Sequence, residues 1–204
     1  MNTFSGSDSI RFGWETFKKR GWFFVLVTVL VGVVTGVISG ITSSLGHDGG
    51  TAQTVGNVLN FVLSTFVGMG VTAFFLKAHD SLETAQSGDL WHPQPFWLYL
   101  ATRLLVGVVV VVGLILLIVP GVIFGLMFMF ASYIVIDKGL GPVEAMKESK
   151  RITDGHKWDL LGFAILLLLI NILGAICLLV GLLVSIPVTS LSVVHAYRTL
   201  SKTA

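Results

Sequence analysis

Residues 144–159, EAMKESKRITDGHKWD, form a polar segment between two stretches that consist almost entirely of apolar side chains. The stretch before it, LLIVPGVIFGLMFMFASYIVI, covers residues 116–136, and the stretch after it, LLGFAILLLLINILGAICLLVGLLV, covers residues 160–184. A helix needs about 20 apolar residues to cross the hydrocarbon core of a bilayer. The polar segment is therefore expected to be an aqueous connection between membrane spans rather than a catalytic loop.

The composition of the whole chain agrees with this interpretation. Of its 204 residues, 54% are hydrophobic and 12% are charged, and the mean hydropathy is +0.89. Soluble domains carry about 25% charged residues. The single cysteine, Cys177, lies inside an apolar run, so we expect a packing residue and no intrachain disulfide. The composition favours one integral membrane domain covering residues 1–204.

Three long apolar blocks predict three helical hairpins, and so an all-α polytopic membrane protein with six transmembrane helices. Proline lacks an amide donor, and Pro120 and Pro187 are therefore expected to mark the turns of the second and third hairpins. A re-entrant pair that never reaches the far side is the alternative for these two blocks. The predicted spans are residues 22–43, 55–76, 96–119, 121–136, 160–183 and 187–200.

Lys and Arg residues are distributed unevenly along this predicted topology. Of the thirteen, twelve lie in the N-terminal segment, the two long connections and the C-terminal segment, whereas the three opposite turns carry none. The positive-inside rule therefore predicts that both termini are cytoplasmic. The first apolar run is longer than the 7–15 residues or so of a signal peptide, so we expect it to be retained.

A polar segment precedes each predicted hairpin. Residues 7–20 and 142–154 each predict an interfacial helix, with acidic residues early and cations late, as the helix dipole favours. Residues 79–97 contain Pro93 and Pro95, which prevent a continuous helix. Cations and tryptophans in such segments are candidates for contact with lipid headgroups. These candidates are Trp14, Lys18, Lys19, Arg20, Lys147, Lys150, Arg151 and Trp158.

Several diffuse motifs, spread over most of the chain, belong together. The Pro-Gly pair at 120–121, the spaced Ala145 and Ser149, Gly155, Pro187 and the Tyr-Arg pair at 197–198 are similar to the membrane domain found beside glycerophosphoryl diester phosphodiesterases. They also resemble related uncharacterised bacterial membrane proteins, as do GVTAFFLKAHD (70–80) and DLW (89–91). The resemblance implies a multi-span protein of the bacterial inner membrane. It implies no enzymatic activity, because the phosphodiesterase chemistry belongs to a separate soluble domain.

Motifs of enzymes and metal sites are missing from the sequence. There is no GxSxG, HExxH or P-loop pattern, and no two of the five histidines are spaced i, i+4. His79, Asp80 and His92 share one connection and could meet in space, although solvated interfacial positions are the simpler interpretation. We therefore expect no catalytic residues, no metal and no cofactor.

Three polar residues inside or near the spans suggest a polar path as an alternative. Asn171 lies near the middle of the fifth predicted span, and Arg103 and His195 lie within about two turns of the cytoplasmic ends. A single Asn more often joins two helices than lines a pathway, and Arg103 is long enough to reach the interface. The predicted spans contain no acidic residue, which argues against a cation-coupled transporter.

The first span carries Gly32, Gly36 and Gly40 at i, i+4 and i+8. This spacing is typical of a helix face that packs closely against another helix, either within the chain or in a second copy. The partners expected are thus membrane lipids and either a homo-oligomer or another membrane protein, without nucleic acid. The leading hypothesis is a non-enzymatic role in envelope organisation, assistance to a partner or lipid handling. The alternative is a small transporter or channel.

Overall fold

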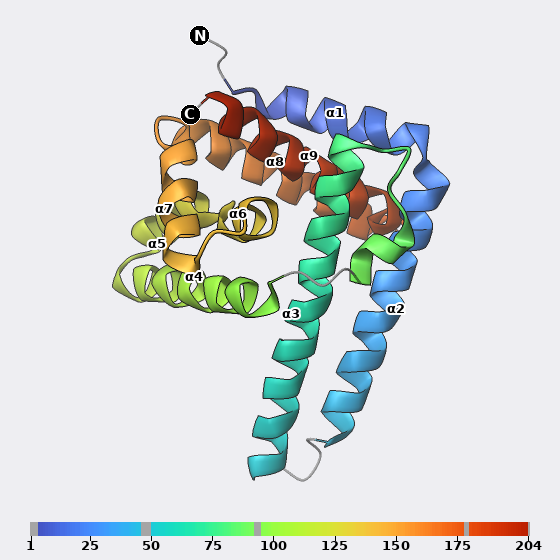
Figure 1. The fold of residues 1–204 in the computed structure, drawn as a ribbon, viewed down its shortest axis with the longest axis vertical. Helices are drawn as coiled ribbons and strands as arrows, with labels where there is room; N and C mark the ends of the chain where they lie inside the picture. The colour runs from blue at the N-terminus through green and yellow to red at the C-terminus, as the bar shows by residue number, and fades with distance from the viewer. Residues whose placement is uncertain (1–3, 46–49, 92–94, 178–179, 204) are drawn as a thin grey trace.

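The computed structural model describes residues 4–45, 50–91, 95–177 and 180–203, and every regular element in these ranges is helical (Figure 1). The elements agree with an all-α membrane protein. In chain order they are α1 (Gly6–Lys19), α2 (Gly21–Leu45), α3 (Gly50–Asp80), the short 3-10 helix η1 (Ser87–Trp91), α4 (Phe96–Leu116), α5 (Ile118–Phe128), α6 (Ala131–Lys138), α7 (Pro142–Thr153), α8 (Lys157–Ile176) and α9 (Leu182–Thr203).

Five segments of the described chain are long and apolar enough to cross a membrane, which indicates a multi-pass membrane protein. They are Gly21–Ser44, Gly50–Asp80, Phe96–Leu116, Ile118–Lys138 and Lys157–Ile176. Six spans are therefore not confirmed. The fourth segment is itself interrupted, because α5 ends at Phe128 and α6 begins at Ala131. The predicted sixth span, residues 187–200, lies in α9, which is not among the five.

The turn predicted at Pro120-Gly121 lies three residues earlier. Leu117 has extended backbone angles and separates α4 from α5. Pro120 is the third residue of α5, where an amide hydrogen would have no partner within the helix, so proline costs no hydrogen bond there. The two helices approach at glycines, since a Cβ added to Gly113 would lie 2.9 Å from the Cα of Gly121. The spans predicted as 96–119 and 121–136 therefore divide at Leu117.

Pro187 does not mark a turn either, because it lies inside α9 as its sixth residue. The chain between α8 and α9 includes Cys177 and Gly181, and a Cβ on Gly174 would lie 3.1 Å from the carbonyl carbon of Gly181. Residues 178–179 lie outside the described chain. The predicted fifth and sixth spans, 160–183 and 187–200, are thus replaced by helices that end at Ile176 and begin at Leu182.

Helix α9 forms the centre of the core. It contacts α1, α2, α3, α7 and α8, and Leu191, Val194 and Tyr197 are completely buried. Helix α1 crosses it closely through Gly13, whose added Cβ would lie 2.5 Å from the carbonyl oxygen of Val188. In Figure 1 the blue α1 lies along the same edge of the molecule as the red α9. The predicted interfacial helix 7–20 is therefore also a core-packing helix, with Ser5 as its N-cap.

Helix α7 covers the place where α5 stops. Ser149 on α7 donates a hydrogen bond of 2.8 Å to the carbonyl oxygen of Met127, and Thr153 approaches the same oxygen at 3.3 Å. Carbonyls in the last turn of a helix lack partners within that helix. Ala145 and Ser149, the spaced pair in the sequence, thus form the buried face of α7. Gly155, with φ of +80°, follows the helix end as expected.

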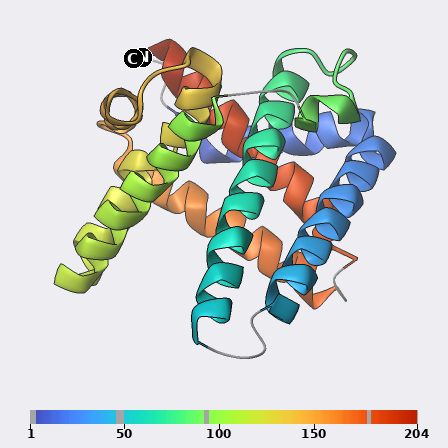
Figure 2. The same cartoon turned by 60° about the horizontal axis from the view of Figure 1, so that its bottom comes forward.

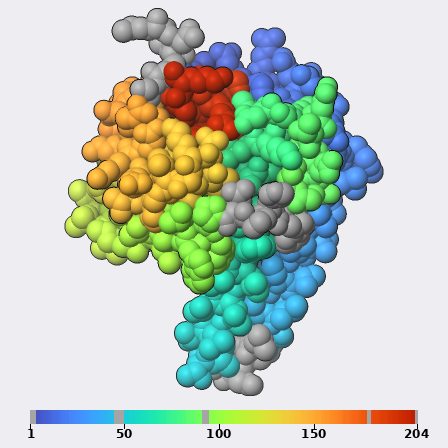
Figure 3. All heavy atoms as spheres, in the orientation of Figure 1, coloured from blue at the N-terminus to red at the C-terminus, as the bar shows by residue number. Residues whose placement is uncertain are grey.

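Helices α2 and α3 pack side by side, and their lower halves protrude from the rest of the molecule (Figure 3). Figure 2 shows α4 diverging from this pair, so the helices are close together at one end of the molecule and apart at the other. Large side chains of α2 are widely exposed, including Trp22, Val33 and Ile41. The exposed surface is apolar, as is typical of a surface that contacts lipid tails.

Candidate functional site

Four polar side chains meet where α3, α6 and α9 end. Arg198 on α9 donates a hydrogen bond of 2.7 Å from Nη1 to Oδ2 of Asp137, and it donates from Nε and Nη2 to both carboxylate oxygens of Asp80. Tyr197 donates from its hydroxyl to the same Asp137 oxygen at 2.6 Å. We call Asp80, Asp137, Tyr197 and Arg198 the Arg198 clamp. It holds the ends of three helices together with charge-assisted hydrogen bonds.

Two histidines extend the Arg198 clamp. Nδ1 of His79 lies 3.0 Å from Oδ1 of Asp80, and Nε2 of His79 lies 3.2 Å from Nδ1 of His195. The ring of Phe12 stacks on that of His195, with centroids 4.1 Å apart. If His79 is neutral and donates from Nδ1 to Asp80, its Nε2 accepts a hydrogen bond from Nδ1 of His195, which fixes both tautomers. This arrangement joins α3 to α9 and buries part of both rings.

An open cavity of about 320 Å³ lies beside the Arg198 clamp. Its charged side chains are already paired with one another, since Lys77 forms an ion pair of 2.7 Å with Asp89 and Arg198 forms ion pairs with both Asp80 and Asp137. Within the described chain, no three His, Cys, Asp or Glu side chains cluster closely enough to hold a metal ion. The pairing indicates a structural role for these charges. His92 lies outside the described residues, so neither its solvated interfacial position nor the alternative, a meeting with His79 and Asp80, is tested.

The three residues of the predicted polar path contact different partners. Asn171 joins α8 to α9, because its Oδ1 accepts from the hydroxyl of Ser185 at 2.9 Å and its Nδ2 donates to the carbonyl of Leu167 at 3.0 Å. His195 pairs with His79. Arg103 lies between α4 and α3, with its guanidinium 5.9 Å from the Tyr99 ring centroid. The amide of Asn171 is engaged on both sides, which favours the interpretation that it joins two helices.

The candidate headgroup contacts differ in the exposure of their side chains and in whether they have partners within the chain. Trp14 and Trp158 are 46% and 84% exposed, and Lys18, Lys19, Lys147 and Lys150 are also exposed. Arg20 instead donates to the carbonyl oxygens of Leu82 and Ala85, at 2.6 and 3.3 Å. Arg151 forms a bidentate pair with Glu148. Arg20 and Arg151 thus have partners within the chain, whereas the lipid role of all eight residues stays a prediction.

Gly32, Gly36 and Gly40 of α2 have no close neighbour in the described part of the chain. A Cβ added to Gly32, Gly36 or Gly40 would meet nothing within 4 Å. Close packing therefore occurs at other glycines, including Gly13, Gly70, Gly113 and Gly174. Packing of the α2 glycines against a second copy or another protein stays a prediction.

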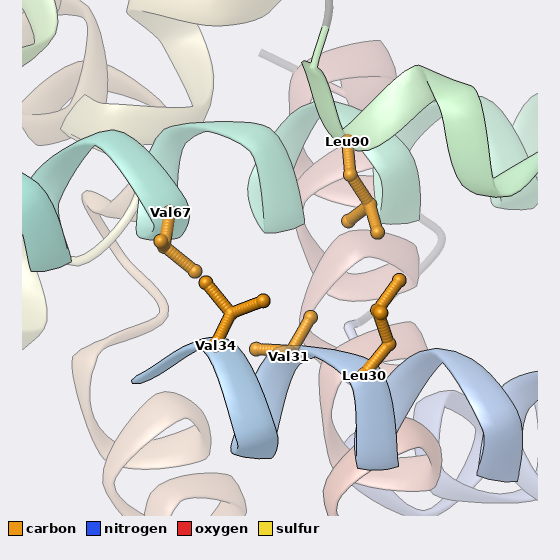
Figure 4. Close-up of a pocket in the computed structure, with 5 residues that line it drawn as sticks. All are labelled: Leu30, Val31, Val34, Val67 and Leu90. Carbon is orange, nitrogen blue, oxygen red and sulfur yellow. The ribbon is translucent and has the colours of Figure 1, made fainter. Parts of the chain in front are cut away.

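Two further hollows are apolar. A groove of about 380 Å³ between α5 and the start of α8 has Lys157 and Trp158 at its polar end. Figure 4 shows the other hollow, where side chains of α2, α3 and η1 converge. Its volume is about 10 Å³, which is barely enough for one water molecule. Of these two hollows, only the groove between α5 and α8 is large enough to accept part of a ligand. The second is lined by Leu30, Val31, Val34, Val67 and Leu90.

The match to a known family covers the second half of the chain. A model of a protein family of unknown function, DUF975, matches residues 99–204. The chain belongs to this family. The matched DUF975 region contains α4 from Tyr99 onward, all of α5 to α9, and three of the four residues of the Arg198 clamp. Asp80 and the rest of α2 and α3 lie outside it.

Relatives of this DUF975 chain are also uncharacterised. Uncharacterized protein Rv2560 of Mycobacterium tuberculosis is 28% identical over 156 residues, which cover 74% of this chain and 46% of the relative. Uncharacterized protein Mb2590 of Mycobacterium bovis is 27% identical over the same length. The chain thus spans about half the length of the curated relatives it matches. No solved structure matches the chain significantly.

Sequence reasoning did not find Asp137, Tyr197 and Arg198 as one site. Asp137 is the last acidic residue before the polar segment, and Tyr197 and Arg198 entered only as part of the family resemblance. The signal available was the position of charged residues at predicted helix ends, where partners from other helices can reach them. Their pairing across about 60 residues of chain depends on tertiary packing.

Proposed function

We propose that this protein is a multi-pass protein of the bacterial inner membrane that handles lipid and catalyses no reaction. The Arg198 clamp fixes the ends of α3, α6 and α9, while the helices diverge beyond it (Figure 2). Divergent apolar helices leave grooves that open toward the surrounding lipid. Membership of a family of unknown function is compatible with this role and names no activity.

The observation that carries the proposal is the groove between α5 and α8. Its walls are apolar, from Ile118, Val122, Leu126 and Leu161, and Trp158 and Lys157 lie at its polar end. Trp158 belongs to the first turn of α8, where aromatic rings favour the headgroup level. An acyl chain in the groove would therefore place its headgroup beside an indole and an ammonium group.

The resemblance to membrane domains beside glycerophosphoryl diester phosphodiesterases supports a setting near lipid chemistry. A phosphodiester is also the linkage that joins a phospholipid to its headgroup. We infer that the protein presents or retains a lipid for a partner, and that any catalytic step belongs to that partner. A small transporter or channel remains the alternative, and it is disfavoured by the hydrogen bonds that occupy both sides of Asn171.

Cross-linking with a phospholipid that carries a photoreactive acyl chain tests the α5–α8 groove. We expect cross-links to concentrate on residues 118–126 and 157–161. The variant Val122→Trp should fill the groove and remove these cross-links, while cross-links to the exposed face of α2 persist. Cross-links spread evenly over all exposed apolar residues would indicate ordinary surrounding lipid and would contradict the proposal.

Cysteine labelling of intact cells tests the proposed orientation with cytoplasmic termini. In a Cys177→Ser background, cysteines at Thr51 and Lys147 occupy exposed positions at the start of α3 and on α7. We expect an impermeant maleimide to label the cysteine at position 51 and not the one at position 147. The reverse result would invert the topology.

A further inference from the structure

Arg103 is a cation inside a candidate membrane span that lacks an acidic partner in the described chain. It lies in Phe96–Leu116, and its side chain is exposed. The ion pairs of the described residues involve Arg11, Arg151, Arg198 and five lysine or histidine positions, but not Arg103. A charge in a membrane span is costly unless it pairs or reaches water, and it marks a functional position by default.

The side chain of Arg103 points back along α4 toward the start of the helix. Its guanidinium lies over Tyr99, four residues earlier, at 5.9 Å from the ring centroid. Side chains in a helix tilt toward its N-terminus. The guanidinium also lies against α3, since a Cβ on Gly68 would lie 3.0 Å from Nη1 of Arg103. The guanidinium therefore lies about one turn closer to the start of α4 than the backbone of Arg103 does.

An apolar groove extends from Arg103 in the opposite direction. Its volume is about 340 Å³, and Arg103 is its one charged lining residue. Gly107, one turn further along α4, has no atom within 4 Å of an added Cβ, so the groove is open beside it. From Arg103 to the last lining residue the helix rises about 13 Å, at about 1.5 Å per residue. The remaining walls are Phe61 of α3 and Leu104, Val108, Val111 and Val112 of α4.

We propose that this groove between α3 and α4 binds an anionic phospholipid. The guanidinium of Arg103 holds the phosphate, because its planar donors match phosphate oxygens with two parallel hydrogen bonds. One acyl chain lies along Gly107 and Val111. The groove has a cation at one end and apolar walls along the rest, just as a phospholipid has a charged headgroup and an apolar chain. This match in charge and polarity selects a phospholipid as the occupant.

The net charge of the headgroup decides which lipid is preferred. In a zwitterionic lipid the amine of the headgroup competes with Arg103 for the phosphate. An anionic headgroup has no such internal partner, so its phosphate gains more from an otherwise unpaired guanidinium. The inference rests on the proposed lipid-handling role and adds a second site. Its cation has no acidic partner in the described chain, whereas Lys157 of the α5–α8 groove forms an ion pair with Asp154 at 3.4 Å.

Native mass spectrometry of the purified full chain tests this site. The protein is exchanged into detergent with equal amounts of phosphatidylglycerol and phosphatidylcholine that carry identical acyl chains. We expect wild type to retain one phosphatidylglycerol preferentially. Arg103→Gln should weaken this retention by about tenfold, the loss of roughly one charge-assisted hydrogen bond. Gly107→Leu keeps the cation but fills the groove, and it should also abolish retention.

Two controls separate the site from general effects. Arg11→Gln removes an exposed cation from α1 and should leave retention unchanged, and Arg103→Lys should restore part of it. Thermal melting confirms that each variant is folded. Soluble glycerol phosphate should not displace the lipid, since the chain contributes to binding.

Several results would overturn the inference. Equal retention by wild type and Arg103→Gln would show that the side chain only reaches the interface. Equal retention of both lipids would remove the charge preference, and an equal loss in Arg11→Gln would indicate nonspecific attraction to a basic surface. Photo-cross-linking to the α5–α8 groove is independent of Arg103. If these cross-links are absent while the preference for phosphatidylglycerol persists, only the proposal for the α5–α8 groove is contradicted.

Discussion

Helices α9 and α2 have opposite environments, although the sequence predicts a membrane span for both. In α9, Leu191, Val194 and Tyr197 are completely buried among other helices. In α2, Val33 and Ile41 are each 58% exposed, and burial is confined mainly to the end near α1. The core of the molecule is therefore built around α9, which at 22 residues is long enough to cross a membrane but is not among the five segments that are also apolar enough.

The difference follows from what the side chains of each helix can contact. Helix α9 carries Thr189 and Ser192, whose hydroxyls bond back to carbonyls one turn earlier at 2.8 and 2.7 Å. Such small polar side chains let helices approach closely. Lipid tails are as apolar as leucine, so a helix gains nothing by hiding leucine from them. High hydropathy thus indicates lipid contact, and moderate hydropathy with small residues indicates the core.

Removing the cation of the Arg198 clamp should produce the largest effect. Arg198→Leu leaves Asp80 and Asp137 without their partner, and the unfolding free energy should fall by about 2–3 kcal/mol, less than for a fully buried pair because Asp80 is partly exposed. Thermal melting in detergent measures this. Arg11→Leu, which breaks the exposed pair with Glu15, is the control and should melt like wild type. Equal melting of both variants would mean that the clamp does not hold α9.

Glycine substitutions compare the core of α9 with the surface of α2 directly. Gly13→Ala places a methyl group 2.3 Å from Oγ of Ser192 and should lower the unfolding free energy by about 2 kcal/mol through overpacking. Gly36→Ala enters open space and should stabilise the monomer by up to about 1 kcal/mol. Melting curves at low protein concentration distinguish them. A destabilised Gly36→Ala variant would reveal a partner of α2 that the single chain lacks.

Acid should weaken the ion pairs of Glu148 before it affects the apolar core. Hydrogen bonds from Arg151 and then Lys138 lower the pKa of Glu148 from 4.5 to about 2. The folded state therefore binds this proton less readily than the unfolded state, so the stabilisation is present above about pH 4.5 and is lost as the pH falls toward 2. Both cations are more than a third exposed, which limits the effect to roughly 1 kcal/mol.

Melting temperatures measured across that pH range check this expectation. Glu148→Gln should remove part of the pH dependence and leave the remainder to other carboxylates. An unchanged pH profile in Glu148→Gln would show that the links from α7 to α6 contribute no stability.

The smallest expected effect belongs to Asn171. Asn171→Leu loses the hydrogen bond from Ser185 at 2.9 Å, and hydrogen bonds between membrane helices contribute about 0.6 kcal/mol on average. Melting of the variant should shift slightly. A large loss of stability would place Asn171 at the centre of the core, and a lost solute flux in proteoliposomes with normal stability would support the transport alternative.

Local signals in the sequence were sufficient to predict the helices but not all their ends. Residues 7–20 and 142–154 came within one residue of α1 and α7, because cap residues and glycines mark these ends. The turns predicted at Pro120 and Pro187 were wrong. Pro120 lies in the first turn of α5, where a proline loses no hydrogen bond, whereas Pro187 lies inside α9. The breaks lie instead where Gly113 meets Gly121 and Gly174 meets Gly181.

The polar contacts could be predicted only in part. Asn171 carries a recognisable signal, a lone amide in an apolar run. The partner of His79 is His195, 116 residues away, and no local pattern connects them. Likewise, the grooves result from the angles between helices, which depend on packing of the complete chain. Arg103 could be identified as unusual, but the apolar groove beside it could not.

The central place of α9 has a consequence for biogenesis. Helix α9 is synthesised after every helix that it contacts. Helices α1 to α8 are therefore synthesised before the core can close. Until α9 is synthesised, Asp80 and Asp137 lack Arg198 as a partner. During this interval the carboxylates and the exposed face of α1 would be available to chaperones or to proteases that recognise incomplete membrane proteins. The core can therefore close only after α9 has reached the membrane.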